Sequence, residues 1–261
     1  MQLRVDGMAV FAATGGRPFA ADRPAVVMLH GAGMDHIVWA LSARSLAHRG
    51  RAVLAPDLPG HGRSEGPALT SIAAMGAWLI RLLDAAGIVE AALVGHSMGS
   101  LIALEVAATA PKRIRRLALL GVAARMPVHP DLLKAARDDP SLAADLIVSW
   151  GHGPAGHFGG NQAPGLWQMG GGQRLLGRAG EGVLASDLSA CDAYDAGASA
   201  AHVTCPSLLL LGAFDRMTPP GKAKALAAAM PKSEVVIIPG AGHMMMSETP
   251  DPVIDALLAF L

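Results

Sequence analysis

Gly95-His96-Ser97-Met98-Gly99 lies between the apolar run Ala91-Ala92-Leu93-Val94, which is typical of a buried strand, and the helix-like segment 98–109. A serine between two glycines at such a junction predicts a tight, strained turn that only small neighbours permit. The turn would place the Ser97 hydroxyl at the end of a sheet and at a helix N-terminus, where the helix dipole favours developing negative charge. We therefore expect Ser97 to be a nucleophile.

Two further reactive groups follow Ser97 in the chain order that this turn requires, serine then acid then histidine. Asp215 comes just after the apolar segment 207–212, and His243 follows the segment 234–238 through a glycine-rich loop. Active-site groups of parallel sheets lie beyond the carboxyl ends of strands. We expect His243 to take the proton of Ser97 and Asp215 to hold the imidazole and stabilise its charged form. Weaker candidates for the acid, because they lie in helix-like sequence, are Asp187, Asp192 and Asp195.

Acyl transfer through a serine also needs N–H donors for the oxyanion that develops on the substrate. One expected donor is the backbone N–H of Met98, which directly follows Ser97. The other is expected in His30-Gly31-Ala32-Gly33, after the apolar segment 25–29, and we expect Ala32 to provide it. The flanking glycines would let this backbone turn its N–H inward.

Strand-like and helix-like segments alternate along most of the chain, which predicts an α/β fold, a mostly parallel sheet with helices on both faces. Residues 125–205 interrupt the alternation. We expect them to form a helical cap inserted into a core made of residues 1–124 and 206–261, and a surface excursion is the alternative. Helices are expected at 140–150 and 181–195.

The centre of this expected cap is rich in glycine. Residues 151–182 contain twelve glycines, three of them consecutive at 170–172. Each glycine in a helix interior costs about 1 kcal/mol relative to alanine. We therefore expect 151–182 to be mobile and not to form a stiff helix.

Composition excludes several classes of protein. The 261 residues are 52% hydrophobic, which suits one α/β domain with an insertion, and the net charge of zero argues against a nucleic-acid partner. No apolar run reaches the ~20 residues of a membrane-spanning helix. Arg4 and Asp6 lie where a signal peptide would need an apolar stretch. We expect a cytoplasmic protein with no membrane partner, in which Cys191 and Cys205 are free thiols. The sequence does not predict an oligomeric state.

Metal and dinucleotide binding are not expected. His152 and His157 lie close together in a glycine-rich run, but the local sequence offers no further ligand at a suitable spacing. The same run neither follows a strand nor opens a helix, as a dinucleotide-binding turn would.

Taken together, these motifs resemble the α/β-hydrolase superfamily, and within it the small cap-bearing carboxylesterases and enol-lactone hydrolases. Ser100 departs from many relatives, which carry a glycine there, and we expect it to alter local packing only. Serine at position 97 disfavours the relatives that work through an aspartyl ester. The shared motifs are His30-Gly31-x-Gly33, Asp57-Leu58-Pro59-Gly60-His61-Gly62-Arg63-Ser64, Gly95-x-Ser97-x-Gly99, Asp215 and Gly242-His243.

The expected function is cleavage of a small, mainly apolar carboxylic ester or lactone by a serine hydrolase that requires no cofactor or metal. The alternatives are the same triad used for C–C bond hydrolysis, perhydrolysis or a lyase or synthase step, and a ligand receptor with slow turnover. His30 and His96 are expected beside the site as scaffold residues. The expected cap has four large apolar side chains, which either line a pocket or pack the cap onto the core. They are Trp150, Phe158, Trp167 and Met169. Residues expected at the substrate are His30, Gly31, Trp150, Trp167 and Met244.

Overall fold

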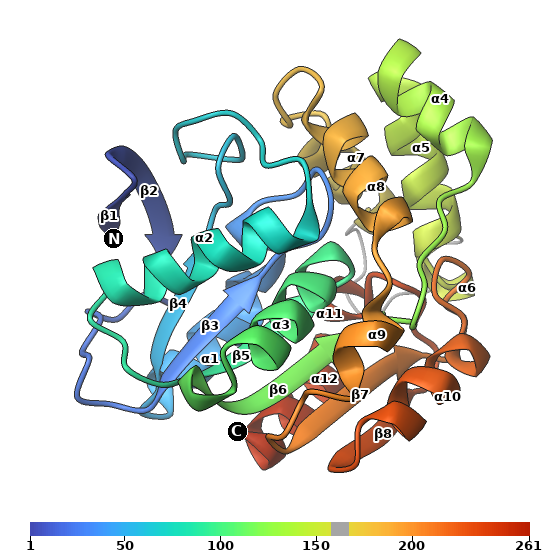
Figure 1. The fold of residues 1–261 in the computed structure, drawn as a ribbon. Helices are drawn as coiled ribbons and strands as arrows, with labels where there is room; N and C mark the ends of the chain where they lie inside the picture. The colour runs from blue at the N-terminus through green and yellow to red at the C-terminus, as the bar shows by residue number, and fades with distance from the viewer. Residues whose placement is uncertain (158–166) are drawn as a thin grey trace.

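The computed structural model describes residues 1–157 and 167–261; Phe158 and the rest of 158–166, within the segment expected to be mobile, lie outside the described residues. In the described part, eight strands form one sheet in the order β1-β2-β4-β3-β5-β6-β7-β8 (Figure 1). The strands are β1 (Gln2–Val5), β2 (Met8–Ala13), β3 (Ala25–Leu29), β4 (Ala52–Pro56), β5 (Ala91–His96), β6 (Ile114–Leu120), β7 (Ser207–Gly212) and β8 (Ser233–Ile238).

Strand pairing confirms the predicted α/β class. The strands β1 and β2 form an antiparallel hairpin, and β2 pairs antiparallel with β4. From β4 onward every neighbouring pair is parallel. The carboxyl ends of β3, β5, β6, β7 and β8 therefore lie along the same edge of the sheet, where residues from distant parts of the sequence can meet.

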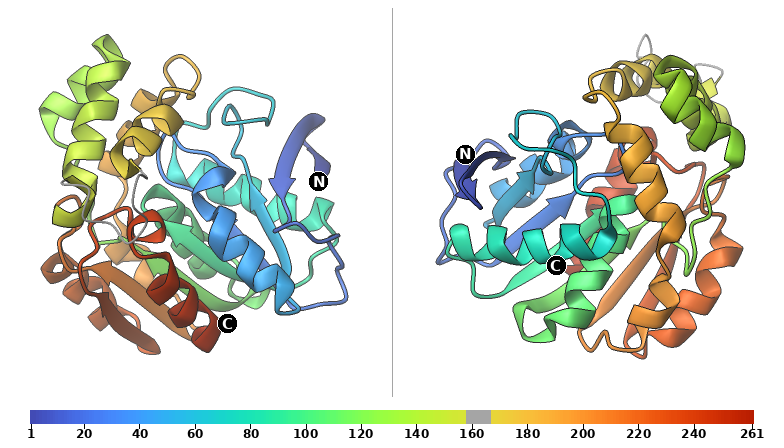
Figure 2. Two further views of the ribbon diagram at one scale, coloured as in Figure 1. Left: turned by 180° about the vertical axis from the view of Figure 1, so that it is seen from behind. Right: turned by 45° about the horizontal axis from the view of Figure 1, so that its top comes forward.

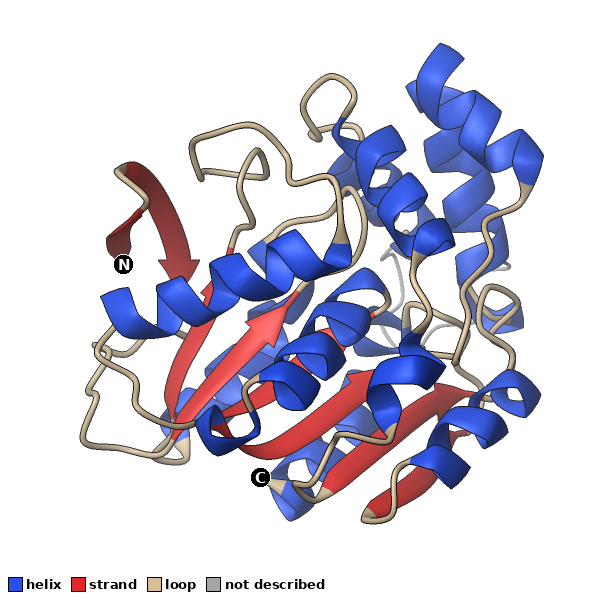
Figure 3. Cartoon of the chain, in the orientation of Figure 1, coloured by secondary structure: helices blue, strands red, loops and turns tan. Residues whose placement is uncertain are grey.

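Helices cover both faces of the sheet (Figures 2 and 3). The helices α1 and α12 contact each other on one face, whereas α2 and α3 pack together on the other. In the described residues, no helix combines the length and the apolar character that crossing a bilayer requires. The helices of the core are η1 (His36–Trp39), α1 (Ala40–His48), α2 (Ile72–Ala85), α3 (Met98–Thr109), η2 (Pro111–Arg113), α10 (Pro220–Ala229), α11 (Met245–Glu248) and α12 (Pro250–Phe260).

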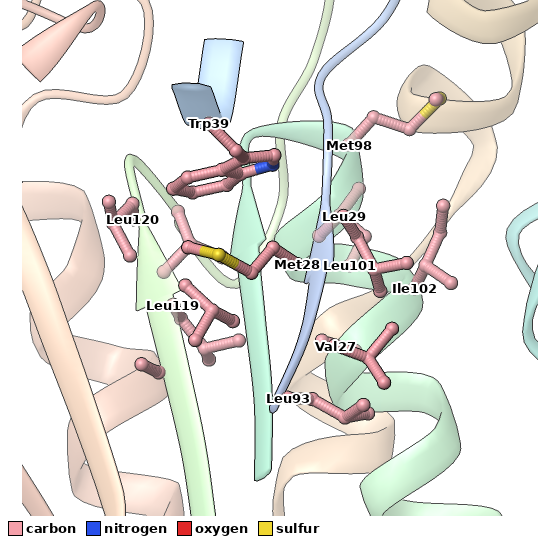
Figure 4. Packing of buried hydrophobic residues seen from close by; sticks show 14 of the residues in the cluster. Val27, Met28, Leu29, Trp39, Leu93, Met98, Leu101, Ile102, Leu119 and Leu120 are labelled. Carbon is pink, nitrogen blue, oxygen red and sulfur yellow. The ribbon is translucent and has the colours of Figure 1, made fainter. Parts of the chain in front are cut away.

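The central strands are buried on both faces, which explains why their sequences are continuously apolar rather than alternating. In β3, Met28 points to the face that carries the fully buried Trp39, whereas Val27 and Leu29 point to the face covered by Leu101 of α3 (Figure 4). This two-sided core fixes the position of β3 and β5, and hence of the loops at their carboxyl ends.

Between β6 and β7, the described residues form the inserted helices, most of which lie beyond the carboxyl end of the sheet (Figure 2), whereas the last of them packs against α3 and α10. The helices expected at 140–150 and 181–195 correspond to α5 and α8. The described helices of this group are α4 (Pro130–Asp138), α5 (Pro140–Gly151), α6 (Pro154–His157), α7 (Gln168–Leu176), α8 (Val183–Ala193) and α9 (Ala196–Ala200).

The expectation that glycine would keep 151–182 from forming a stiff helix does not hold for Gln168–Leu176, because α7 runs through three consecutive glycines there. A Cβ at Gly170 would overlap the ring of Trp167, and one at Gly172 would lie 3.1 Å from Val148 on α5. Two of the glycines thus let Trp167 and α5 pack tightly against α7, and this packing offsets the low helix propensity of glycine. Tertiary contacts of this kind cannot be read from the local sequence.

Candidate active site

The backbone of Ser97 is strained as the sequence pattern implies. Ser97 has φ +53° and ψ −118°, and among the described residues only Asp6 is another non-glycine residue with positive φ. A Cβ at Gly95 would overlap the carbonyl of Gly99, and one at Gly99 would overlap that of Leu29. Both flanking glycines are therefore required for β5 to turn directly into α3. The hydroxyl of Ser97 has no hydrogen-bond partner in the described part of the chain.

Hydrogen bonds to β6 hold this turn in place. The N–H of Ser97 donates to the carbonyl of Leu120 over 2.9 Å. The buried hydroxyl of Ser100 lies 2.8 Å from the carbonyl of Gly95 and 3.0 Å from that of Leu120, and it accepts the N–H of Leu120. The serine at position 100 thus ties the turn to the end of the neighbouring strand.

Asp215 lies in a tight loop after β7 that is closed by its own carboxylate. Oδ1 accepts the N–H groups of Met217 and Thr218, both over 2.8 Å. Oδ2 accepts the hydroxyl of Thr218 over 2.6 Å and lies 2.8 Å from Nδ1 of His243. Burial alone would raise the pKa of this carboxyl, but the charge and hydrogen bond of His243 and the hydrogen bonds of Thr218 hold it well below its usual range. Asp215 is therefore ionised, and its partner Nδ1 carries a proton.

Thr218 is a member of the site that the sequence analysis missed. Its hydroxyl is 3.2 Å from Nδ1 of His243 as well as hydrogen-bonded to Asp215. The signal available in the sequence was the spacing Asp-x-x-Thr, since an aspartate commonly accepts the backbone N–H groups of the residues that follow it in a turn.

The loop that carries His243 runs from β8 back over the ends of two other strands. It passes Gly212 of β7 so closely that a Cβ there would overlap the carbonyl of Gly242. The His243 ring then lies over Gly121, after β6, where a Cβ would be 2.9 Å from both Cε1 and Nδ1. Glycine at these two positions lets a histidine from the outer strand β8 reach the region of Ser97.

His96 and His30 are buried neutral scaffold residues. Nε2 of His96 donates to the carbonyl of His243 over 3.0 Å, and burial, with the charge of His243, lowers the pKa of His96 to about 3. Nδ1 of His30 donates to the carbonyl of Gly31, and its Nε2 accepts the N–H of Leu58. Burial, with the charge of His61, lowers the pKa of His30 to about 4. Each ring has a fixed tautomer that shapes a loop of the site.

The two expected oxyanion donors lie close to Ser97: Met98 directly follows it, and Ala32 follows Gly31, where a Cβ would be 3.3 Å from Cβ of Ser97. Met98 begins α3. Ala32 lies in a turn closed by the N–H of Met34 and the carbonyl of Gly31, 3.2 Å apart, and Gly33 has φ +66° there. A negative φ followed by a positive φ is typical of a type II turn. No acceptor for the N–H of Ala32 or Met98 is found among the described residues.

A cavity of about 600 Å³ brings Ser97, His243 and Thr218 together with the inserted helices. Of the residues expected at the substrate, Trp150 lines this cavity. The others do not: His30, Gly31 and Met244 are buried, and Trp167 is 68% exposed, with its ring packed over Gly170 of α7. The lining residues are Ala32, Met34, Ser97, Met126, Pro127, Val128, His129, Pro130, Leu132, Ile147, Trp150, Leu188, Cys191, Arg216, Met217, Thr218, Lys222 and His243.

The other acidic residues weighed for the role of Asp215 have different partners. Asp192 accepts the N–H of Val128, and Asp195 pairs with Arg125 at the surface. Asp187 is buried against Gly33 and His61. Of these four carboxylates, Asp215 alone contacts His243.

One group of side chains among the described residues has the spacing of a metal site, namely Asp35, His36 and Asp57. The carboxylate oxygens of this group already accept hydrogen bonds from backbone N–H groups. Oδ1 of Asp57 accepts the N–H of His36 and lies 2.8 Å from the His36 ring, and Oδ2 accepts the N–H of Arg63. Asp35 accepts the N–H of Ile37 at the start of η1. These hydrogen bonds link the segment after β3 to the segment after β4.

The sheet is mostly parallel, and a serine, an acid and a histidine lie beyond the ends of β5, β7 and β8. This strand order and this arrangement of groups define an α/β-hydrolase type of enzyme. The model of the alpha/beta hydrolase family matches residues 26–256, so the chain belongs to that family. It is 29% identical to the putative carbamate hydrolase RutD of Pseudomonas savastanoi pv. phaseolicola, over 92% of this chain and 95% of the relative.

Two solved structures extend this similarity. The enol-lactonase from Burkholderia xenovorans LB400 superposes with a TM-score of 0.89 at 25% identity, covering 100% of this chain and 99% of that one. A thermophilic esterase superposes with a TM-score of 0.82 at 29% identity, covering 100% and 96%.

Proposed function

We propose that this protein is a serine hydrolase that cleaves small, mainly apolar carboxylic esters or lactones through an acyl-enzyme on Ser97. The observation that carries the proposal is the buried Asp215–His243 pair, joined over 2.8 Å, whose histidine lines the same cavity as the strained Ser97. A histidine held by an ionised carboxylate is a general base, and a serine at an elbow is positioned for attack.

In the acylation step, Ser97 Oγ attacks the carbonyl carbon while Nε2 of His243 takes its proton. Nδ1 of His243 keeps its proton toward Asp215, whose negative charge stabilises the imidazolium that forms. The negative charge on the substrate oxygen is accepted by the N–H groups of Ala32 and Met98. Collapse of the tetrahedral intermediate expels the alcohol, which receives the proton from His243.

In the deacylation step, His243 takes a proton from water, which attacks the acyl carbon, and Ser97 leaves with that proton. With a lactone, the expelled hydroxyl stays on the acyl chain, and the product is a hydroxy acid. Neither step needs a group beyond the side chains and backbone N–H groups named above.

The cavity supports esters or lactones rather than a small carbamate as substrates. Its volume of about 600 Å³ is in the range that holds drug-sized ligands, and most of its lining is apolar. Residues of the inserted helices, among them Trp150 and Leu188, line it together with Ser97. We accordingly propose that 125–205 is a cap on a core of 1–124 and 206–261, and that the cap sets chain-length preference.

The test is a series of p-nitrophenyl esters from acetate to octanoate together with simple lactones, with Ser97→Ala as the inactive control. An organophosphonate should add once per chain, and peptide mapping should find it on Ser97. Turnover that survives Ser97→Ala, or an adduct on another residue, would overturn the proposal. Slow single-turnover labelling without release would instead favour a ligand receptor.

A further inference from the structure

Asp187 joins the inserted helices to the loop that carries the expected oxyanion donor. It lies on α8 and is fully buried. Its Oδ2 accepts the N–H of Gly33 over 2.8 Å and lies 2.8 Å from Nε2 of His61. Gly33 directly follows Ala32, so one carboxylate oxygen of the insertion reaches the turn beside Ser97 from a position 154 residues away in the chain.

The hydrogen bonds of His61 indicate that this contact is an ion pair. Its Nδ1 is 3.0 Å from the carbonyl of Pro59, and its Nε2 faces Asp187. A carbonyl only accepts, so both contacts are satisfied when both ring nitrogens carry protons and Asp187 is ionised. Burial would lower the pKa of His61, but the hydrogen bond and charge of Asp187 outweigh it and the pKa lies above its usual value.

The other titratable groups near His61 are compatible with its positive charge. The His30 ring lies 4.9 Å away between centroids, and its pKa of about 4 makes it neutral at pH 7. Asp57 adds a negative charge that favours the imidazolium. The pair is almost completely shielded from water, with side-chain exposures of 1% for His61 and 0% for Asp187.

The same helix also packs on the turn sterically. A Cβ at Gly33 would lie 2.8 Å from Cδ1 of Leu184, one turn before Asp187. On the inner side, a Cβ at Gly31 would be 3.3 Å from Cβ of Ser97. The turn from Gly31 to Met34 is thus enclosed between Ser97 and α8, and Asp187 fixes the peptide group between Ala32 and Gly33.

A role in stability alone does not explain this carboxylate well. Oδ1 of Asp187 is buried and has no hydrogen-bond partner among the described residues. A buried ion pair with an unsatisfied oxygen is a poor source of stability compared with apolar packing of the same volume. What the carboxylate provides and an apolar residue does not is a directed acceptor for Gly33.

We propose that Asp187, paired with the protonated His61, is a positioning residue that orients the Ala32 N–H for the oxyanion by holding the N–H of Gly33. The inference rests on the proposed function of Ser97 and Ala32. It means that the oxyanion site is complete only when α8 is seated on the turn, so the insertion would contribute to the chemical step as well as to the pocket.

Asp187→Asn tests this inference, because the amide keeps the shape but loses the charge that pairs with His61. We expect kcat on p-nitrophenyl butyrate to fall roughly 10- to 100-fold, less than the loss of a whole oxyanion donor, while KM changes little. Ser189→Ala, on the same helix but exposed and with its hydroxyl bonded to Ala185 of that helix, is the matched control and should leave both constants unchanged.

Inhibitor binding separates positioning from a general loss of structure. A trifluoromethyl ketone that forms a tetrahedral adduct should bind Asp187→Asn at least about tenfold more weakly, whereas the matching methyl ketone should bind as it does to the wild type. His61→Gln should have the same effect, and the double variant should lose no more than the worse single variant, because both residues act through one pair.

A readout that needs no turnover keeps the inference separate from the proposed function. Amide exchange at Gly33 should be roughly tenfold faster in Asp187→Asn, while exchange at Met98 stays unchanged. If Ser97→Ala abolishes turnover but Asp187→Asn matches Ser189→Ala in kcat and in Gly33 exchange, the inference is wrong and the proposed function stands. Turnover by Ser97→Ala would overturn the proposed function instead. If Asp187→Asn does not fold, a neutral His61 ring in the wild type at pH 7, measured by ¹⁵N NMR, would overturn the inference, and an imidazolium would support it.

Discussion

His243 lies directly over Gly121, and a single methyl group at position 121 would be 2.9 Å from both Cε1 and Nδ1 of its ring. Gly121 follows β6 and has φ +60°, a conformation that favours glycine. The absence of a side chain at the end of β6 is therefore what allows the ring to lie between Asp215 and the cavity.

We expect Gly121→Ala to displace the His243 ring and to lower kcat about 100-fold, since a shift of about 1 Å in a reacting group can have an effect of this size. Gly87→Ala is the matched control, because Gly87 has a similar φ of +68° but nothing within 4 Å of its Cβ position. Steady-state kinetics and thermal unfolding of the two variants check the prediction. Equal kcat in both variants would contradict it.

Substitutions at Asp215 and Thr218 should lower kcat by different factors. Asp215→Asn removes the charge that fixes the His243 tautomer, and we expect kcat to fall by about 10⁴. Thr218→Val removes only the hydroxyl that donates to Oδ2 of Asp215 over 2.6 Å. The expected loss there is about 10- to 100-fold, because hydrogen bonds to charged groups contribute about 1.5–3 kcal/mol. Thr218→Ser should restore activity, and a Thr218→Val enzyme with wild-type kcat would show that Asp215 does not depend on this donor.

The free energy of unfolding should fall as the pH drops from about 6.5 to about 4. His30 and His96 have pKa values near 4 and 3 in the folded protein, so between these values and the usual 6.5 the unfolded chain binds protons that the folded chain does not. Each group adds a slope of about 1.4 kcal/mol per pH unit in this window. His61 has the opposite shift, and its contribution is fully present below its unfolded pKa and is lost only as the pH rises through its folded pKa.

Urea unfolding from pH 4.5 to 8 checks this expectation. His96→Gln should remove about half of the slope that the two histidines produce below pH 6.5. A wild-type stability that is flat from pH 4.5 to 6.5 would contradict the assignment of two buried neutral histidines.

The charges at the cavity should influence which esters are turned over. Arg216 and Lys222 line it, and no carboxylate side chain is among its described lining residues. We expect a monoaryl glutarate to react about 3- to 10-fold faster in kcat/KM than a choline ester of similar length at low ionic strength, with the difference shrinking in salt. Lys222→Gln should reduce the preference, whereas Lys224→Gln, on the same helix outside the cavity, should not. An unchanged preference in Lys222→Gln would show that the cation is fully screened.

Much of the site could be predicted because its parts follow strands directly in the sequence. Ser97, Asp215 and His243 each come just after an apolar strand segment, and parallel strands bring such positions to one edge. Neither the contact between Asp187 and Gly33 nor that between Asp187 and His61 has a local signal, because the partners are 154 and 126 residues apart. Such contacts depend on how the inserted helices dock, which no short motif encodes.

The glycines of α7 show a case in which a local signal was present but tertiary packing outweighed it. Propensity argued against a stiff helix in 151–182, but packing against Trp167 and α5 favours small residues within α7. The same packing explains why Trp167 is exposed beside α7 and does not line the cavity. Intrinsic propensity is a weak guide where neighbouring elements approach this closely.

The strand order places the proposed nucleophile and its proposed general base on strands of different exposure, and this bears on how denaturant would inactivate the enzyme. Ser97 follows β5 in the middle of the sheet, whereas His243 follows β8 at its edge, where Val235 is 46% and Ile237 is 52% exposed. An edge strand with so little buried apolar surface is expected to open in local unfolding events of lower free energy than those that open the centre. Mild denaturant would then detach His243 while β5 and the Ser97 turn remain folded, so that enzymatic activity disappears before the circular dichroism of the sheet changes.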